Sequence, residues 1–232
     1  MMDRRTVLGA LLSPVVANKA TAAPARSGPG LRIDRFDTAS GRRGPAIVLL
    51  YGSDGLTNTG RYEAAARAIA AAGYTVFLPR YFEVTSDVRA RYGDLRTKFP
   101  FWRQAIVDAL AGPIASAPGI DRNRIGVVGF SLGGALALAA SAQTARIKAV
   151  VNYFGYLPDE LAAAKRFAPT LILHGDSDRI VPVSNAAAIA QLLKSRGAHV
   201  ETQIYQGEGH GLSARVLPDA ISRTANFLGR YL

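Results

Sequence analysis

A serine, an aspartate and a histidine stand in three glycine-containing segments whose residue types suit nucleophilic chemistry. Ser131 is the centre of the pattern Gly-Phe-Ser-Leu-Gly, Asp178 ends the segment His-Gly-Asp-Ser-Asp, and His210 lies within Gly-Glu-Gly-His-Gly. A serine hydroxyl is a poor nucleophile at neutral pH, because it needs an imidazole to take its proton and a carboxylate to fix that imidazole's tautomer. The three residues therefore predict attack on a carbonyl carbon, with Ser131 as nucleophile, His210 as base and Asp178 as its partner.

The surroundings of Ser131 predict a sharp turn between a strand and a helix. A short β-rich run over 124–129 precedes it, and a helix of small residues is expected over 132–143. Glycines on both sides let the chain turn without Cβ clashes. The turn presents the hydroxyl at a helix N-terminus, where N–H groups favour developing negative charge. A tight turn with a passive serine is the alternative interpretation.

Other residues compete for the roles of acid and base. Asp176 is the alternative acid, although it stands closer to the preceding strand than Asp178 does. His174 ends a buried strand, so we expect it to brace the loop, and His199 begins an outer strand, so we expect it to be exposed. Asp178 and His210 could also be solvent-exposed loop residues.

A tetrahedral intermediate also needs two N–H groups directed at its oxygen. The backbone amide of Leu132, which follows the candidate nucleophile, is expected to supply one. The loop Gly-Ser-Asp-Gly-Leu at 52–56 is expected to supply the other, with Ser53 as the preferred donor. The glycines of this loop also fit a turn into the next helix, and the two roles are compatible.

Strands and helices alternate along the predicted structure. Strands are expected at 31–36, 46–51, 74–78, 124–129, 147–153, 170–174 and 199–205, and helices at 59–72, 99–117, 132–143, 185–196 and 214–231. This alternation predicts an α/β fold with right-handed crossovers and a mostly parallel, doubly wound sheet. Ligands of such sheets bind at the carboxyl ends of the strands, which is where the three candidate residues are expected.

The first 25 residues have the layout of an export signal. Arg4 and Arg5 precede a modest apolar stretch over 7–17 and then small residues, which is typical of twin-arginine signals. The apolar stretch is far shorter than the roughly 20 residues that span a bilayer. We therefore expect a periplasmic or secreted protein without a membrane span, in which residues 26–232 form a single domain. A terminus without a signal is the alternative.

Composition excludes several classes of protein and cofactor. A chain of 232 residues with 49% hydrophobic and 19% charged residues suits one globular domain rather than a disordered chain. The absence of cysteine excludes disulfides, thiolate nucleophiles and iron–sulfur clusters, and only three histidines make a histidine-rich metal site difficult to build. We expect no metal and no organic cofactor. The formal charge of +11 comes from scattered arginines without a basic run or an aromatic ladder, so no nucleic-acid partner is expected.

Taken together, the motifs resemble those of the dienelactone hydrolase family of α/β-hydrolases. They are the segments 129–134, 174–182 and 207–211, in the order Ser, Asp, His that this superfamily uses. The resemblance covers nearly all of the chain from about residue 31. It implies a serine hydrolase that cleaves a small-molecule carboxylic ester or lactone through an acyl-enzyme intermediate.

Two departures separate this sequence from the founding members of that family. Those members use cysteine at the position of Ser131 and carry a glutamate where this chain has Gly52. The departures argue against dienelactone itself as the substrate. An acyltransferase or peptidase on the same scaffold, and a catalytically silent binding protein, are the alternative functions.

The resemblance also implies which segments form the walls of the substrate pocket. Only residues 154–169 separate two strands at the position where the superfamily inserts cap domains, so no large cap is expected. The longer loop over 79–100 is expected to wall the pocket instead. Within it, Arg80 stands at a strand end, where we expect it to contact an acidic substrate group, with Tyr81 as a second contact. A solvated arginine is the alternative.

Overall fold

Seven strands form one sheet in the order β1-β3-β2-β4-β5-β6-β7, in which only the edge strand β1 is antiparallel to its neighbour among the described strands. The computed structural model describes residues 31–38, 43–57 and 59–232, so the predicted export signal lies outside the described residues. The strands are β1 (Ile33–Phe36), β2 (Gly44–Leu50), β3 (Thr75–Pro79), β4 (Ile120–Phe130), β5 (Ile147–Tyr153), β6 (Thr170–Gly175) and β7 (Val200–Tyr205).

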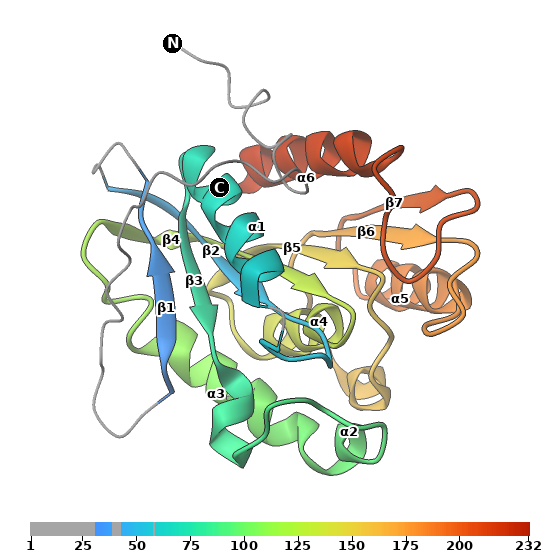
Figure 1. Cartoon of the computed structure of the whole chain (residues 1–232), viewed down its shortest axis with the longest axis horizontal. Coiled ribbons are helices and arrows are strands. Elements are labelled where there is room, and N and C mark those ends of the chain that lie inside the picture. The colour runs from blue at the N-terminus through green and yellow to red at the C-terminus, as the bar shows by residue number, and fades with distance from the viewer. Residues whose placement is uncertain (1–30, 39–42, 58) are drawn as a thin grey trace.

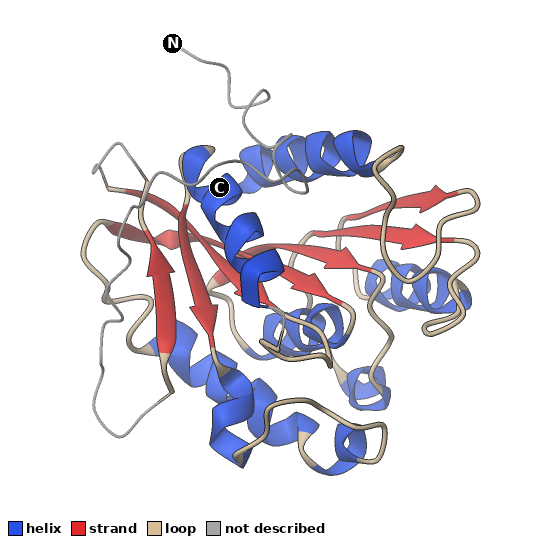
Figure 2. Cartoon of the chain, viewed as in Figure 1, coloured by secondary structure: helices blue, strands red, loops and turns tan. Residues whose placement is uncertain are grey.

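Helices cover both faces of the sheet, α1 and α6 on one side and α3, α4 and α5 on the other (Figures 1 and 2). They are α1 (Thr59–Ala71), α2 (Asp94–Thr97), α3 (Phe99–Ala111), α4 (Leu132–Gln143), α5 (Ser184–Ser195) and α6 (Leu217–Tyr231), with short 3₁₀ helices at Tyr81–Thr85 and Asp159–Ala163. Because both faces are covered, a central strand such as β2 is a continuous apolar run, buried from residue 45 to Leu50. The predicted doubly wound α/β fold is confirmed.

The most deeply buried helix is the one that follows the candidate nucleophile. Every residue of α4 from Leu132 to Ser141 is buried, and the helix packs on β4, β5 and α3. Its composition explains this position, because alanine and glycine allow close approach to the sheet on several sides. The start of α4 is therefore held firmly at the carboxyl end of β4.

Two helix boundaries differ from the prediction by three residues or more, and a proline lies at each. The helix predicted over 99–117 ends at Ala111, because Gly112 leaves helical geometry and Pro113 cannot continue the hydrogen-bond pattern. The helix predicted from residue 214 begins at Leu217, with Pro218 in its first turn, where a missing N–H costs nothing.

The carboxyl edge of the sheet carries no large cap in the described part of the chain. The segment 154–169 forms only a turn and the 3₁₀ helix Asp159–Ala163, and the segment 80–98 folds into a 3₁₀ helix and α2. Of the helices described, none is long and apolar enough to cross a membrane.

Candidate active site

Ser131 occupies a strained turn between β4 and α4. Its backbone has φ 54° and ψ −117°, a conformation that side-chain-bearing residues rarely adopt. A Cβ added to Gly129 would lie 2.2 Å from the carbonyl oxygen of Gly133, and one added to Gly133 would lie 2.3 Å from that of Leu50. Both glycines are therefore required by close backbone approach, as the pattern around Ser131 predicts. The turn is fixed by a hydrogen bond of 2.9 Å from the Ser131 amide to the Tyr153 carbonyl.

The structure brings together the serine, aspartate and histidine that the sequence singles out. Ser131 follows β4, Asp178 follows β6 and His210 follows β7, all at the carboxyl edge of the sheet. His210 Nε2 lies 2.9 Å from Ser131 Oγ, and His210 Nδ1 lies 2.7 Å from Asp178 Oδ2. A carboxylate can only accept, so Nδ1 carries the proton and Nε2 offers its lone pair to the serine O–H. The imidazole is thus oriented to take the serine proton.

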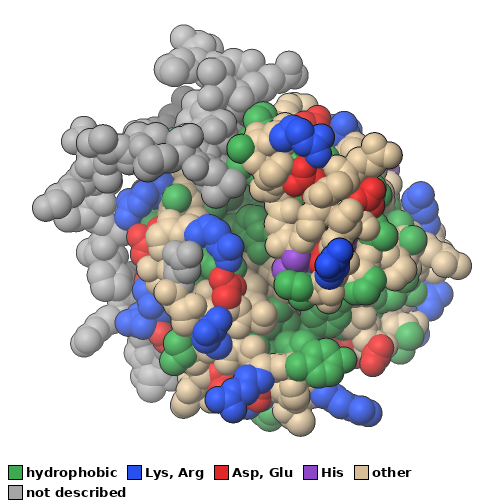
Figure 3. Space-filling view, turned by 45° about the vertical axis from the view of Figure 1, so that its right-hand side comes forward, with side chains coloured by type: hydrophobic (Ala, Val, Ile, Leu, Met, Phe, Trp, Pro, Cys, Tyr) green, Lys and Arg blue, Asp and Glu red, His purple; other side chains and the backbone are tan. Residues whose placement is uncertain are grey.

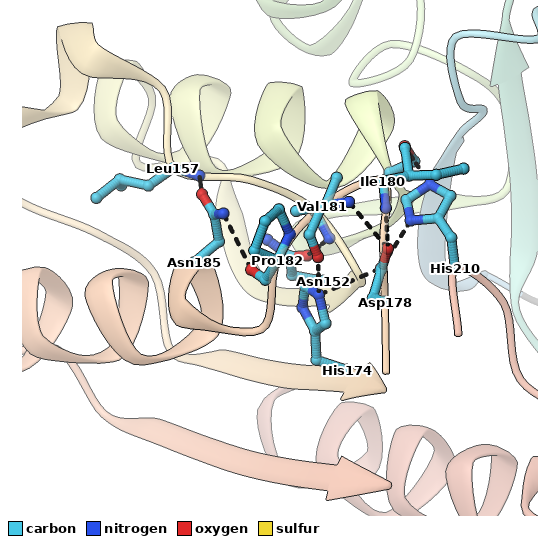
Figure 4. A network of polar contacts seen from close by, with 11 residues as sticks. Asn152, Leu157, His174, Asp178, Ile180, Val181, Pro182, Asn185 and His210 are labelled. Atoms are coloured by element: carbon cyan, nitrogen blue, oxygen red, sulfur yellow. Dashed lines mark hydrogen bonds and ion pairs between the residues drawn. The ribbon is translucent and has the colours of Figure 1, made fainter. Parts of the chain in front are cut away.

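The Asp178 carboxylate is buried and well supplied with donors (Figure 4). Its Oδ1 accepts the amides of Ile180 and Val181 at 2.8 and 2.9 Å, while Oδ2 accepts from His210. Burial pushes the pKa of Asp178 upward, but the hydrogen bonds from His210, Val181 and Ile180 outweigh it and hold the pKa below its ordinary value. Asp178 is therefore charged at neutral pH.

The alternative acid has a different role. Asp176 is exposed, and its Oδ1 accepts the Ser177 hydroxyl at 3.0 Å and the Gly207 amide at 2.8 Å. These contacts tie the loop after β6 to the loop after β7. Asp176 therefore helps to hold two loops in register, and Asp178 is the residue that contacts His210.

Glu208 and Phe154 support His210, and sequence reasoning did not assign these roles. The Glu208 carboxylate accepts from the Ser213 amide and hydroxyl and from Arg215, at 2.7 to 2.8 Å. Those hydrogen bonds, led by the Ser213 amide, hold the pKa of Glu208 below its ordinary value. On another side, the Phe154 ring meets the imidazole edge-to-face, with ring centres 5.0 Å apart. Glu208 thus shapes the loop that carries His210, and Phe154 restrains its ring.

Ser131 and His210 line a cavity of about 430 Å³ whose walls are mainly apolar. Figure 3 shows hydrophobic side chains gathered around a hollow in which a histidine is visible. The apolar walls include Tyr62, Ala65, Phe130, Tyr153, Phe154, Ile180, Leu212 and Leu217. Among the described residues, no group of three or more histidine or acidic side chains could hold a metal ion. The cavity therefore suits a small ligand with an apolar portion next to the reacting group.

A polar network orders the loop that follows β2, on one wall of the cavity. The Tyr62 hydroxyl accepts from the Gly52 amide at 2.9 Å and donates to Asp54 Oδ1 at 2.8 Å. Arg61 donates to Asp54 Oδ2 at 2.6 Å. Burial raises the pKa of Tyr62 to about 12, so its hydroxyl stays protonated. Ser53, the predicted donor, lies in this ordered loop and lines the cavity.

The two predicted substrate contacts, Arg80 and Tyr81, are used within the fold instead. Arg80 Nε donates to Asp34 Oδ2 at 2.8 Å, so its charge is neutralised by β1. Tyr81 is fully buried, its ring stacks on Tyr51 with centres 4.1 Å apart, and its hydroxyl donates to the Tyr51 carbonyl. Neither residue lines the cavity. The structure therefore gives both side chains partners within the fold and places neither of them in the cavity wall.

Known proteins resemble this chain over much of its length. A protein from Mus musculus named "Carboxymethylenebutenolidase homolog" is 27% identical over 187 residues, covering 76% of this chain and 74% of that protein. A Yersinia pestis protein named "Putative carboxymethylenebutenolidase" is 28% identical over 176 residues, which cover 68% of this chain. The match spans 66% of the length of the Yersinia pestis protein, just under two thirds.

A solved structure and a family model complete the comparison. The structure titled "Putative Dienelactone Hydrolase" from Klebsiella pneumoniae aligns with a TM-score of 0.72 at 20% identity, covering 87% of this chain and 93% of that one, which shows a shared fold. The model of the dienelactone hydrolase family matches residues 36–226, from β1 into α6. This chain therefore belongs to the dienelactone hydrolase family, within the α/β-hydrolase superfamily.

Proposed function

We propose that this protein is a serine hydrolase that cleaves a carboxylic ester or lactone through an acyl-enzyme intermediate. The observation that carries the proposal is the hydrogen-bonded series Asp178–His210–Ser131, with contacts of 2.7 and 2.9 Å. Membership of a hydrolase family and an apolar cavity around Ser131 support it. The series has the order and the tautomer that activate a serine hydroxyl.

The proposed reaction has two halves. Ser131 Oγ attacks the substrate carbonyl while its proton moves to His210 Nε2, and the charged Asp178 stabilises the resulting imidazolium. The tetrahedral intermediate collapses, His210 protonates the departing alkoxide, and an acyl group remains on Ser131. Water then attacks this acyl group with His210 again as base, which releases the carboxylic acid and restores the serine. With a lactone, the freed alcohol stays attached to the acyl chain.

The oxyanion would form between α4 and the loop after β2. We assign its stabilisation to the amides of Leu132, at the first turn of α4, and Ser53, in the ordered loop. The free N–H groups at the start of a helix can donate hydrogen bonds to the negatively charged oxygen of the intermediate. The positive end of the α4 dipole stabilises the same charge. In this proposal the hydrogen bond from the Gly52 amide to the Tyr62 hydroxyl holds the loop after β2 in the conformation that presents the Ser53 amide.

Substitution of Tyr62 by phenylalanine tests this assignment. The ring stays, but the Gly52 amide loses its buried acceptor, which costs about 1–3 kcal/mol in the native loop. We expect kcat for a p-nitrophenyl ester to fall by about 10- to 100-fold, less than the roughly 10²–10³ lost when an oxyanion donor is removed outright. Tyr92, which is 94% exposed, gives the matched control Tyr92→Phe. Equal kcat in the two variants would remove Tyr62 from the oxyanion assignment.

Labelling with an alkyl fluorophosphonate tests the proposed function itself. The activated serine attacks phosphorus, fluoride leaves, and the adduct is read by intact mass. We expect one adduct on the wild type and on Ser195→Ala, whose serine is exposed on α5, and none on Ser131→Ala. Absence of an adduct on folded wild-type protein would contradict the proposal. Turnover of esters and lactones in water, without an alcohol or amine acceptor, would then separate hydrolysis from acyl transfer.

A further inference from the structure

We propose that His174 is a positioning residue of this site, a neutral imidazole whose Nε2–H fixes the Asp178 carboxylate in the orientation that faces His210. The inference rests on the proposed function, because it concerns the partner of the candidate base. His174 does not touch the cavity or Ser131, and it would act only through Asp178.

The contacts of His174 identify which ring nitrogen carries the proton (Figure 4). Its side chain, at the end of β6, is fully buried. Nε2 lies 2.9 Å from the Val181 carbonyl oxygen and 3.4 Å from Asp178 Oδ2. Both atoms can only accept, so Nε2 must be the protonated nitrogen. Its N–H therefore donates to Val181, and Asp178 Oδ2 lies beside the same nitrogen at 3.4 Å.

The remaining nitrogen favours a neutral ring. His174 Nδ1 has no hydrogen-bond partner among the described residues, and a second proton there would bury an unpaired N–H. The single ring proton therefore stays on Nε2, where it has an acceptor.

His174 completes a set of contacts that leaves the carboxylate little freedom. Asp178 Oδ1 accepts the amides of Ile180 and Val181, and Oδ2 faces the two histidines. The Val181 peptide is held on both sides, by its N–H to Asp178 and by its C=O to His174. Removing the His174 N–H would free the Val181 carbonyl and remove the polar hydrogen that lies beside Oδ2. The carboxylate could then rotate away from the position 2.7 Å from His210 Nδ1.

Two substitutions separate this role from simple packing. His174→Leu fills the space without a donor, whereas the amide of His174→Gln can place an N–H near the former Nε2. His199→Leu is the matched control, because the His199 side chain is 55% exposed. The readouts are kinact and KI for an alkyl fluorophosphonate, and the far-downfield proton resonance of the His210 Nδ1–H in the phosphonylated protein. Thermal unfolding of each variant reports its stability.

We expect His174→Leu to lower kinact by about 10- to 100-fold, the cost of a small misplacement of catalytic groups, with KI within about twofold of the wild type. The downfield resonance should broaden or vanish in His174→Leu, and His174→Gln should recover most of both signals. His199→Leu should match the wild type.

Two outcomes would overturn the inference. In the first, His174→Leu is labelled at the wild-type rate. In the second, His174→Gln folds but is labelled as slowly as His174→Leu, and both variants keep the downfield resonance. If His174→Leu does not fold, His174→Gln decides: a near wild-type kinact with the resonance supports the role, and slow labelling overturns it. Failure of the proposed function would look different, because the wild type itself would then form no adduct.

Discussion

Replacing Ser131 by alanine is expected to lower kcat for p-nitrophenyl ester hydrolysis by about a factor of 10⁶, the loss typical of removing a catalytic serine. The hydroxyl that His210 contacts at 2.9 Å would be absent, so no acyl-enzyme could form. The cavity walls and the two candidate amides would remain, so KM should change little and a small rate above the reaction in water should persist. Steady-state kinetics on a series of esters measures both quantities.

The control for this prediction is Ser195→Ala, because Ser195 is exposed and its hydroxyl donates to the Leu192 carbonyl of its own helix. Its kcat should equal that of the wild type. Thermal unfolding should show that Ser131→Ala remains folded, because alanine at this position removes only the hydroxyl. A Ser131→Ala protein that retains more than about 1% of wild-type kcat would exclude Ser131 as the nucleophile.

The second large effect is expected for Asp178→Asn, which should lower kcat by about 10⁴-fold. The amides of Ile180 and Val181 require an acceptor, so they would hold the asparagine oxygen in the place of Oδ1. The asparagine NH₂ would then face His210 Nδ1 and stabilise the tautomer with its proton on Nε2. That nitrogen could no longer accept the serine proton, although the geometry would be nearly unchanged.

Asp176→Asn is the matched control, because Asp176 is the neighbouring exposed acid that contacts Ser177 and Gly207. It should keep nearly full kcat. Comparable losses in the two variants would contradict the assignment of Asp178 as the partner of His210. Measuring kcat and KM for both on the same ester makes the comparison direct.

Stability gives a second readout of the same substitution. The pKa of Asp178 is lower in the folded protein than in the unfolded chain, so the folded state binds fewer protons. The carboxylate's contribution is therefore fully present above the unfolded pKa and is lost as pH falls through the lowered, folded pKa. The difference in unfolding free energy between wild type and Asp178→Asn should accordingly shrink on acidification. If the difference in unfolding free energy between the two proteins stayed constant down to low pH, the lowered pKa of Asp178 would be contradicted.

Local patterns predicted the parts of this molecule that depend on neighbours in the sequence. The turn around Ser131 follows from two glycines between a strand and a helix, and the parallel sheet follows from alternating elements. The proximity of Ser131, Asp178 and His210 could be expected as well, because carboxyl ends of parallel strands meet at one edge. These features need no knowledge of which distant side chains meet.

Contacts between distant segments explain what the sequence could not predict. Arg80 pairs with Asp34 because β1 runs antiparallel to β3, which brings Asp34 opposite Leu78 and within reach of the guanidinium. Nothing near Arg80 in the sequence indicates that partner. The bracing role of His174 was predictable from its place at a strand end, but its shared contact with Val181 and Asp178 depends on how the loop after β6 returns over the ring.

The close approach of Gly133 to β2 has a consequence for how such an enzyme can change over evolutionary time. A Cβ on Gly133 would lie 2.3 Å from the carbonyl oxygen of Leu50 and 2.5 Å from that of Tyr51, immediately before the loop that carries Ser53. The two backbone segments pack directly against each other, so the turn of Ser131 and that loop form one rigid unit. Cavity side chains outside this unit and its polar network, such as Ala65 and Leu217, can be exchanged without altering it, so new substrates can be accommodated while the reacting geometry is inherited intact.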